Sequence, residues 1–149
     1  KRKTIPLKAD AFLVLQTRLF EHIQRKQNLI PQAVRNKIKF ALQITDSIDK
    51  HWIIVNFRKG EVHFETLAVL PSDIDLHIEI RSSTLEYSLS NEWGGDAIVI
   101  GYGAEIFVYH EARLITSDYV FSHFFHCCVG IFPALAIEFV FSQVHSVPI

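Results

Sequence analysis

The chain has 149 residues, of which 49% are hydrophobic and 21% are charged, and its formal net charge is -1. This length suits one globular domain with a single core, and the composition excludes a disordered chain. The balanced charge supplies no general electrostatic attraction to nucleic acid or to anionic lipid surfaces, so we expect no nucleic-acid partner.

The first predicted element is an amphipathic helix over residues 7–27. Its apolar side chains recur at four-residue spacing: Ala11, Leu15, Leu19 and Ile23. This spacing places them on one face of a helix, which we expect to cover the core. Pro31 interrupts the pattern, and residues 31–36 predict one further helical turn.

Patterns of period two then predict four strands in succession. Apolar and polar residues alternate over residues 37–44. Strands over residues 52–58 and 62–69 flank the turn Lys59-Gly60-Glu61, which predicts a hairpin. The fourth strand shows the strictest alternation, with Ile74, Leu76, Ile78 and Ile80 between Asp73, Asp75, His77 and Glu79.

A short helix and two further strands follow the fourth strand. Ser83 and Glu86 fit a capping box, which predicts a helix that ends near residue 91 with Leu85 and Leu89 facing inward. Residues 97–102 and 105–109 then predict two more strands. The predicted fold class is therefore α+β, with a mainly antiparallel sheet of about five or six strands and helices on one face.

Residues 119–141 are almost wholly apolar and match the length of a transmembrane helix. Four residues interrupt this run and would be costly in hydrocarbon: His123, His126, Pro133 and Glu138. We therefore expect a buried or cavity-lining pair of helices, broken near Gly130, and no stable transmembrane span. Residues 1–149 are then one domain with a helical apolar tail over about residues 117–149.

The cysteines and the start of the chain bear on its setting. Cys127 and Cys128 are adjacent and are the only two cysteines, so no disulfide framework is expected and a reducing, cytoplasmic location is favoured. The chain begins at Lys1 and contains no methionine. We therefore expect a fragment of a longer protein.

Two stretches within residues 38–108 resemble the sterol carrier protein family: FALQITDSIDKHWIIVNFRKGEVHF and DIDLHIEIRSSTLEYSLSNEWGGDAIVIGYGAEIFV. The shared pattern is a strand that ends in a Thr-Asp turn, a strand containing tryptophan, a Lys-Gly hairpin, and an Asp-initiated strand that runs into a Ser-x-x-Leu helix. This resemblance implies helices packed on one face of the sheet, with an apolar tunnel between them for fatty acyl chains, sterols or other lipids.

Such domains are also appended to larger metallo-β-lactamase-like hydrolases, including alkyl sulfatases. Two glycine-bearing segments are more elaborate than in free-standing carriers and are more similar to the appended type: Trp93-Gly94-Gly95-Asp96 and Ile100-Gly101-Tyr102-Gly103. The resemblance thus implies either a lipid carrier or an accessory domain.

One cluster in the apolar tail carries residue types that bind zinc: His123, His126, Cys127 and Cys128. A spacing of three places both imidazoles on one helix face, and imidazoles and thiolates suit this metal. A structural zinc site normally needs four ligands, however, and the sequence offers no matching second pair. We therefore favour a packed aromatic helix with half-buried histidines, and predict no metal and no cofactor.

The strands carry other polar residues that could form a site. His63 and His77 lie on strands that could be neighbours, but we favour two solvent-side histidines over a functional pair. Asp73, Asp75 and Glu79 share one strand face. This could indicate a carboxylate site, but acidic residues opposite an apolar row more often form the solvent-exposed side of a sheet.

The sequence offers no assembled catalytic set. The glycines at 94, 95, 101 and 103 lack the Lys-Ser/Thr ending of a phosphate loop. No serine lies in a nucleophile elbow, and neither cysteine has an evident activating partner. Ser82, Ser83 and Thr84 are better explained as helix caps. We predict no catalytic residues and no enzyme in this chain, with the activity of the full-length protein left open.

The excess of phenylalanine is the feature that an ordinary core explains least well. The chain has 12 phenylalanines, and half of them lie in the tail: Phe121, Phe124, Phe125, Phe132, Phe139 and Phe141. Surplus apolar surface marks a ligand cavity, a subunit interface or a membrane contact, and a well-filled core is the plain alternative.

The leading hypothesis is a binding domain that holds a lipid or other apolar small molecule in a cavity between the sheet and the helices. The predicted lining residues come from the strands, the short helix and the tail: Ile54, Phe64, Leu85, Leu89, Phe121, Phe124 and Phe125. The alternative is an accessory domain that forms a homodimer or docks onto an upstream catalytic domain of a larger, metallo-hydrolase-like enzyme.

Overall fold

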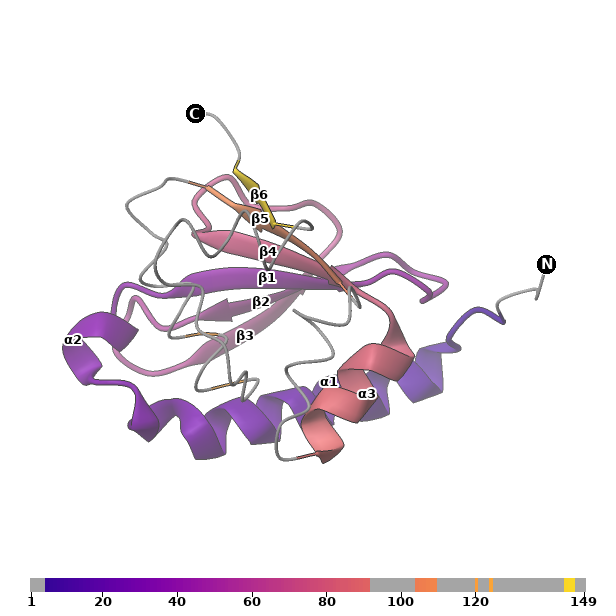
Figure 1. Ribbon diagram of the computed structural model, residues 1–149, viewed down its shortest axis with the longest axis horizontal. Helices are drawn as coiled ribbons and strands as arrows, with labels where there is room; N and C mark the ends of the chain where they lie inside the picture. The colour runs from indigo at the N-terminus through magenta and orange to yellow at the C-terminus, as the bar shows by residue number, and fades with distance from the viewer. Residues whose placement is uncertain (1–4, 92–103, 110–119, 121–123, 125–143, 147–149) are drawn as a thin grey trace.

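The computed structural model describes residues 5–91, 104–109, 120, 124 and 144–146 of the chain. Figure 1 shows the elements in chain order, and their bounds are α1 Ala9–Lys26, the 3-10 helix η1 Gln27–Leu29, α2 Gln32–Arg35, β1 Lys39–Ile44, β2 Trp52–Asn56, β3 His63–Leu67, β4 Leu76–Ile80, α3 Ser82–Ser90, β5 Ala104–Val108 and β6 Val144–Ser146. The strand predicted over residues 97–102 and most of the helical pair predicted over residues 119–141 lie outside the described residues.

The strands form one sheet of six strands in the order β3-β2-β1-β4-β5-β6. The pairs β1/β2, β2/β3 and β4/β5 are antiparallel, whereas β1/β4 and β5/β6 are parallel. The predicted α+β class with a mainly antiparallel sheet is confirmed. The hairpin β2–β3 lies on one side of β1. After β3 the chain crosses to the other side of β1, where β4 pairs with it in parallel at the centre of the sheet.

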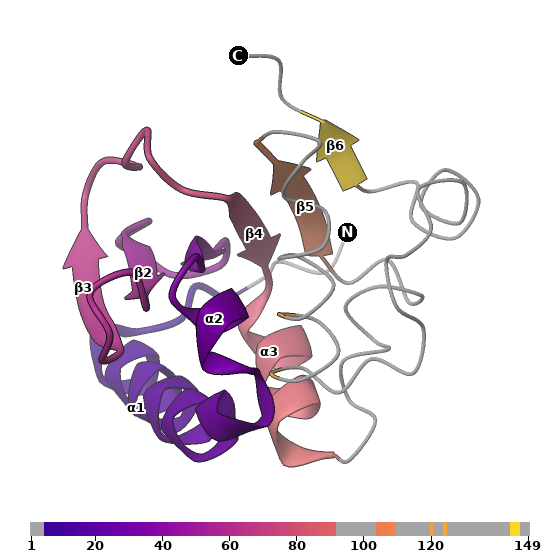
Figure 2. The same ribbon diagram turned by 90° about the vertical axis from the view of Figure 1, so that its left-hand side faces the viewer.

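One face of this sheet is covered by α1 and α3, as Figure 2 shows from the side. From α1, Leu15, Leu19 and Ile23 are buried in the same core as Phe40 of β1 and Ile78 of β4. The four-residue apolar spacing therefore identified the buried face of the first helix at these three positions, whereas Ala11 in its first turn is exposed. None of the helices in the described part of the chain is both long and apolar enough to span a membrane.

The predicted hairpin between the second and third strands is confirmed. Val55 of β2 lies opposite Phe64 of β3 in an antiparallel register. Gly60 in the connecting turn has a φ of 96°, a left-handed conformation that glycine adopts without the steric cost of a Cβ.

The opposite face of the sheet also has buried apolar residues. Ala41, Ile54 and Ile74 are buried there, with Trp52 and Tyr109 packed against them. The prediction that the polar side of the fourth strand faces solvent is wrong at two positions, since Asp75 is only 1% exposed and His77 only 7% exposed. The physical reason is that β4 is a central strand, with β1 on one side and β5 on the other.

The strands of His63 and His77, considered above as possible neighbours, are not adjacent, and of the two histidines only His63 is exposed. His63 begins β3, at one edge of the sheet, whereas His77 lies on β4. Two strands, β2 and β1, separate them. No functional pair of these two histidines forms.

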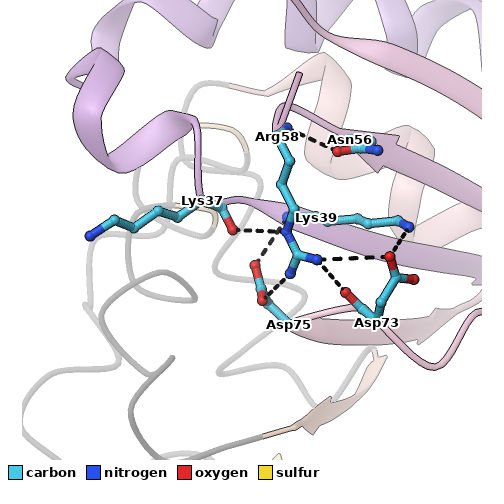
Figure 3. A network of polar contacts seen from close by, with 6 residues as sticks. All are labelled: Lys37, Lys39, Asn56, Arg58, Asp73 and Asp75. Atoms are coloured by element: carbon cyan, nitrogen blue, oxygen red, sulfur yellow. Dashed lines mark hydrogen bonds and ion pairs between the residues drawn. The ribbon is translucent and has the colours of Figure 1, made fainter. Parts of the chain in front are cut away.

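Asp75 joins several strands at the end of the sheet where β1 and β4 begin (Figure 3). Its Oδ1 accepts a hydrogen bond from Arg58 Nη2 at 2.7 Å, and its Oδ2 accepts one from the Lys39 amide at 3.0 Å. Its own amide donates to the Lys39 carbonyl at 2.8 Å, and its carbonyl accepts from the Tyr109 amide at 2.9 Å. The backbone and the carboxylate of Asp75 thus hold the start of β4 against β1, against Arg58 just after β2 and against Tyr109 just after β5.

Asp73 lies beside this network but is largely exposed. Its Oδ2 accepts a hydrogen bond from Lys39 Nζ at 2.6 Å, and its side chain is 59% exposed. The hydrogen bond from Lys39 holds the pKa of the Asp73 carboxyl below its ordinary value. Solvent screens such an exposed pair, so it adds little to stability.

We expect Asp75→Asn to lower the free energy of unfolding by about 3 kcal/mol, because an amide has one acceptor oxygen in place of two and removes the buried counter-charge of Arg58. The exposed Asp73 carboxylate, 3.9 Å from the guanidinium, then remains as its counter-charge. Asp73→Asn is the matched control and should cost less than about 1 kcal/mol. Urea unfolding followed by circular dichroism measures both, and equal losses would contradict this role of Asp75.

A second aspartate fixes the start of α3. Asp46 follows β1, and its carboxylate accepts hydrogen bonds from the Ser82 amide at 2.8 Å and from Ser82 Oγ at 2.5 Å. The predicted capping box is wrong: Ser83 and Glu86 lie inside α3, and no side chain of the helix's own N-cap residue, Arg81, caps it. The reason is that the helix begins at Ser82, directly after β4, and a residue distant in sequence supplies the cap.

Asp46→Asn should lower the free energy of unfolding by about 1 kcal/mol, since the cap and its charge near the helix N-terminus are both weakened. Asp49→Asn in the same loop is the control, because the Asp49 side chain is exposed. Amide hydrogen exchange in α3 should accelerate only in the Asp46 variant. Unchanged exchange in α3 would show that the helix does not depend on this carboxylate.

Candidate functional site

An apolar groove of about 410 Å³ lies between the first half of α1, the loop after β1 and the edge strand β3. The lining residues come from these three segments: Leu7, Ala9, Phe12, Leu13, Gln16, Ser47, Ile48, Asp49, His51 and Thr66. This volume falls within the range of small-molecule pockets, about 300–1,000 Å³.

Backbone hydrogen bonds build the first wall of the groove. The Leu7 amide donates to the Asp46 carbonyl at 2.6 Å, and the Ile48 amide donates to the Leu7 carbonyl at 3.2 Å. Ser47 Oγ donates to the Asp49 carbonyl at 2.6 Å and closes the loop. The segment before α1 is thereby paired with the loop after β1, and the groove has a fixed backbone on this side.

The second wall is the contact between α1 and β3. Gln16 Nε2 donates to Thr66 Oγ1 at 2.6 Å. Further along the same two elements, the rings of Phe20 and Phe64 stack with their centroids 4.0 Å apart. These contacts keep the helix against the edge strand and set the width of the groove.

The groove keeps large apolar side chains in contact with water. Leu13 is 59% exposed and Ile48 is 64% exposed, and both line it. Val14, the next residue on α1, is 63% exposed but does not line the groove. An apolar molecule in the groove would cover Leu13 and Ile48 and remove that surface from water, which is favourable.

The residues predicted to line a cavity do not all lie together. Leu85 and Phe124 are fully buried in the core under the helices, and Phe64 and Leu89 pack against that core. Ile54 lies instead in the apolar cluster on the opposite face of the sheet. Phe121 and Phe125 lie outside the described residues.

Aromatic rings occupy the described part of the layer between the sheet and the helices. Phe124 stacks on Phe57 with ring centroids 5.6 Å apart, and its ring centroid lies 6.2 Å from that of Phe40. His22 of α1 is hydrogen bonded to the Phe124 carbonyl. The apolar groove lies at the edge of this layer, next to β3. The cavity predicted beneath the tail stays a prediction, because Phe121 and Phe125 lie outside the described residues.

Sequence reasoning missed the groove because its lining residues do not share one periodic pattern. Leu13 breaks the four-residue spacing of α1, and Ile48 is a single apolar residue in a polar turn. Such isolated apolar residues carry a weak signal, since single exposed hydrophobic residues are common on protein surfaces. Only the fold brings these two side chains to one groove.

The outer face of the sheet holds a polar pair among aromatic rings. His77 Nδ1 and the Tyr109 hydroxyl share a hydrogen bond of 2.5 Å. The imidazole also stacks on the ring of Phe107, with the two ring centroids 4.3 Å apart. Burial and the negative charge of Glu79 raise the pKa of Tyr109, so its hydroxyl stays protonated at neutral pH. The hydrogen bond joins β4 to the residue that directly follows β5.

The described residues contain no group of three or more histidine, cysteine, aspartate or glutamate side chains placed to hold a metal ion. The cluster of His123, His126, Cys127 and Cys128 lies outside the described residues, so the expectation of no metal there stays a prediction.

Comparisons with known proteins give one structural neighbour. No family model matches the chain, and no curated protein matches it. A solved structure named "UbiJ-SCP2 Ubiquinone synthesis protein", a sterol carrier protein-like domain, is similar over 63% of this chain and 75% of its own length, with 15% sequence identity and a TM-score of 0.41. At this level of similarity the neighbour carries no functional argument, and the argument below rests on the groove of this chain alone.

Proposed function

We propose that this chain is a non-catalytic binding domain that holds a lipid or another apolar small molecule in the groove between α1, the loop after β1 and β3. The observation that carries the proposal is the groove itself, in which Leu13 and Ile48 expose more than half of their surface to water. Burial of these side chains and of the ligand's own apolar surface supplies the binding free energy.

The free energy gained by burying the apolar surface of a ligand is large enough for a measurable affinity. Each buried methylene group contributes about 0.8 kcal/mol. Micromolar affinity corresponds to about 8 kcal/mol. Burial of about ten methylene groups therefore reaches this range, and a longer chain offsets the cost of immobilising the ligand.

The described polar residues support a binding role without catalysis. The buried carboxylate of Asp75 is engaged by Arg58 and Lys39, and that of Asp46 by Ser82. These groups hold strands and a helix in place. The cytoplasmic location and the attachment to a larger metallo-hydrolase-like enzyme stay predictions.

Leu13→Glu should weaken the binding of a fluorescent fatty acid about tenfold or more, because it places a charge on the apolar wall and removes the side chain that the ligand covers. Val14→Glu is the matched control, since it makes the same change at an equally exposed position of α1 outside the groove. Displacement titrations and mass spectrometry of co-purified lipid measure the effect.

Equal affinity of the two variants would place the ligand elsewhere, and absence of both co-purified lipid and probe binding in the unaltered chain would refute the proposal. The alternative role as a dimerisation or accessory domain predicts a different result. In that case light scattering would show a dimer of the unaltered chain that Leu13→Glu dissociates, without any bound lipid.

A further inference from the structure

The apolar groove is one end of a longer seam between α1 and β3. Figures 1 and 2 both show α1 alongside β3, the strand at the edge of the sheet. The contacts run in opposite directions along the two elements, from Gln16 with Thr66 to Phe20 with Phe64. Beyond the stacked rings, Gln24 and His63 line a second groove.

This second groove is polar and has a volume of about 820 Å³. It lies between the end of α1, the α2 region and the turn from β2 to β3, and its lining residues are Gln24, Gln27, Asn28, Gln32, Arg35, Lys59, Gly60, Glu61, Val62 and His63. A Cβ atom at Gly60 would meet no heavy atom within 4 Å, so the turn leaves open space there. Carboxamides and cations dominate the lining, which gives it many hydrogen-bond donors.

Two cations lie on opposite walls of this polar groove. Arg35 Nη1 donates to the Gln27 carbonyl at 2.9 Å and to Asn28 Oδ1 at 3.2 Å, which fixes the guanidinium at the end of α1. Its Nε is buried and has no hydrogen-bond partner among the described residues. Lys59 is exposed on the turn. Among the described residues that line the groove, Glu61 is the one carboxylate beside Arg35 and Lys59, so positive charge is in excess there.

The two grooves are close enough for one ligand. Gln16 lines the apolar groove and Gln24 lines the polar one. Eight residues of helix separate them, which corresponds to about 12 Å along the axis of α1. The half-buried rings of Phe20 and Phe64 lie between and continue the apolar surface from one groove toward the other.

We infer that the ligand is a single-chain amphiphile with a terminal acidic group. Its hydrocarbon chain lies in the apolar groove and across Phe20 and Phe64, and its carboxylate or phosphate lies in the polar groove between Arg35 and Lys59. Guanidinium and ammonium groups make charge-assisted hydrogen bonds to such oxygens. This inference rests on the proposed function, because it needs a ligand in the apolar groove.

The test compares three ligands of identical chain length by isothermal titration calorimetry on the full chain: a fatty acid, an alkyl phosphate and a fatty alcohol. We expect both acids to bind about tenfold more tightly than the alcohol, since a charge-assisted hydrogen bond favours the acids and is partly screened at an open site. Lys59→Glu should reduce the affinity for both acids to that for the alcohol, and Gln24→Glu on the opposite wall should act in the same direction.

Lys37→Glu is the matched control, because Lys37 is exposed and its ammonium points away from the network of Figure 3, outside the lining of either groove. Equal binding of acids and alcohol, or an equal effect of Lys37→Glu and Lys59→Glu, would overturn the acidic head group while leaving the apolar groove as a binding site. Failure of all three ligands to bind the unaltered chain would instead refute the proposed function.

Discussion

The carboxylate of Asp75 accepts from Arg58 and from the Lys39 amide, while the backbone of the same residue bonds to Lys39 and to Tyr109. A charge that is only 1% exposed is costly to bury, and it is tolerated here because each oxygen has a donor. These bonds hold the start of β4 beside β1 and so fix the register of the parallel pair at the centre of the sheet. A shift of β4 by one residue would break the bond between Arg58 and Asp75 and turn the apolar side chains of β4 to the opposite face.

Asp46 performs the corresponding role at the other end of β1. Its carboxylate caps α3 through Ser82, and its carbonyl accepts from the Leu7 amide, so the segment that leads into α1 is tied to the end of the central strand. Both helices on the covered face are therefore placed relative to β1 by one residue. The first wall of the apolar groove depends on the bond between the Leu7 amide and the Asp46 carbonyl. The attachment of α1 to the central strand therefore also shapes the proposed binding site.

Periodicity predicted those elements whose burial is decided within one segment. The apolar stripe of α1 at Leu15, Leu19 and Ile23, the hairpin around Gly60 and a strand at β4 are all present. Periodicity could not tell that β4 is central, so the burial of Asp75 and His77 was missed. It could not assign Ile54 to a face either, because Ile53, Ile54 and Val55 are all apolar. The groove was beyond prediction for the same reason, since Leu13 and Ile48 come together only through the pairing of Leu7 with the loop after β1.

The central claim is that an apolar ligand lies along the seam between α1 and β3. Titration of an isotopically labelled chain with a long-chain fatty acid, followed by amide chemical shifts in NMR spectra, tests this claim residue by residue. The account predicts that the largest shifts occur within residues 12–16, 47–51 and 59–66, the segments that contribute side chains to the two grooves and the seam. Shifts concentrated around Trp52, His77 and Tyr109 on the opposite face of the sheet would contradict it.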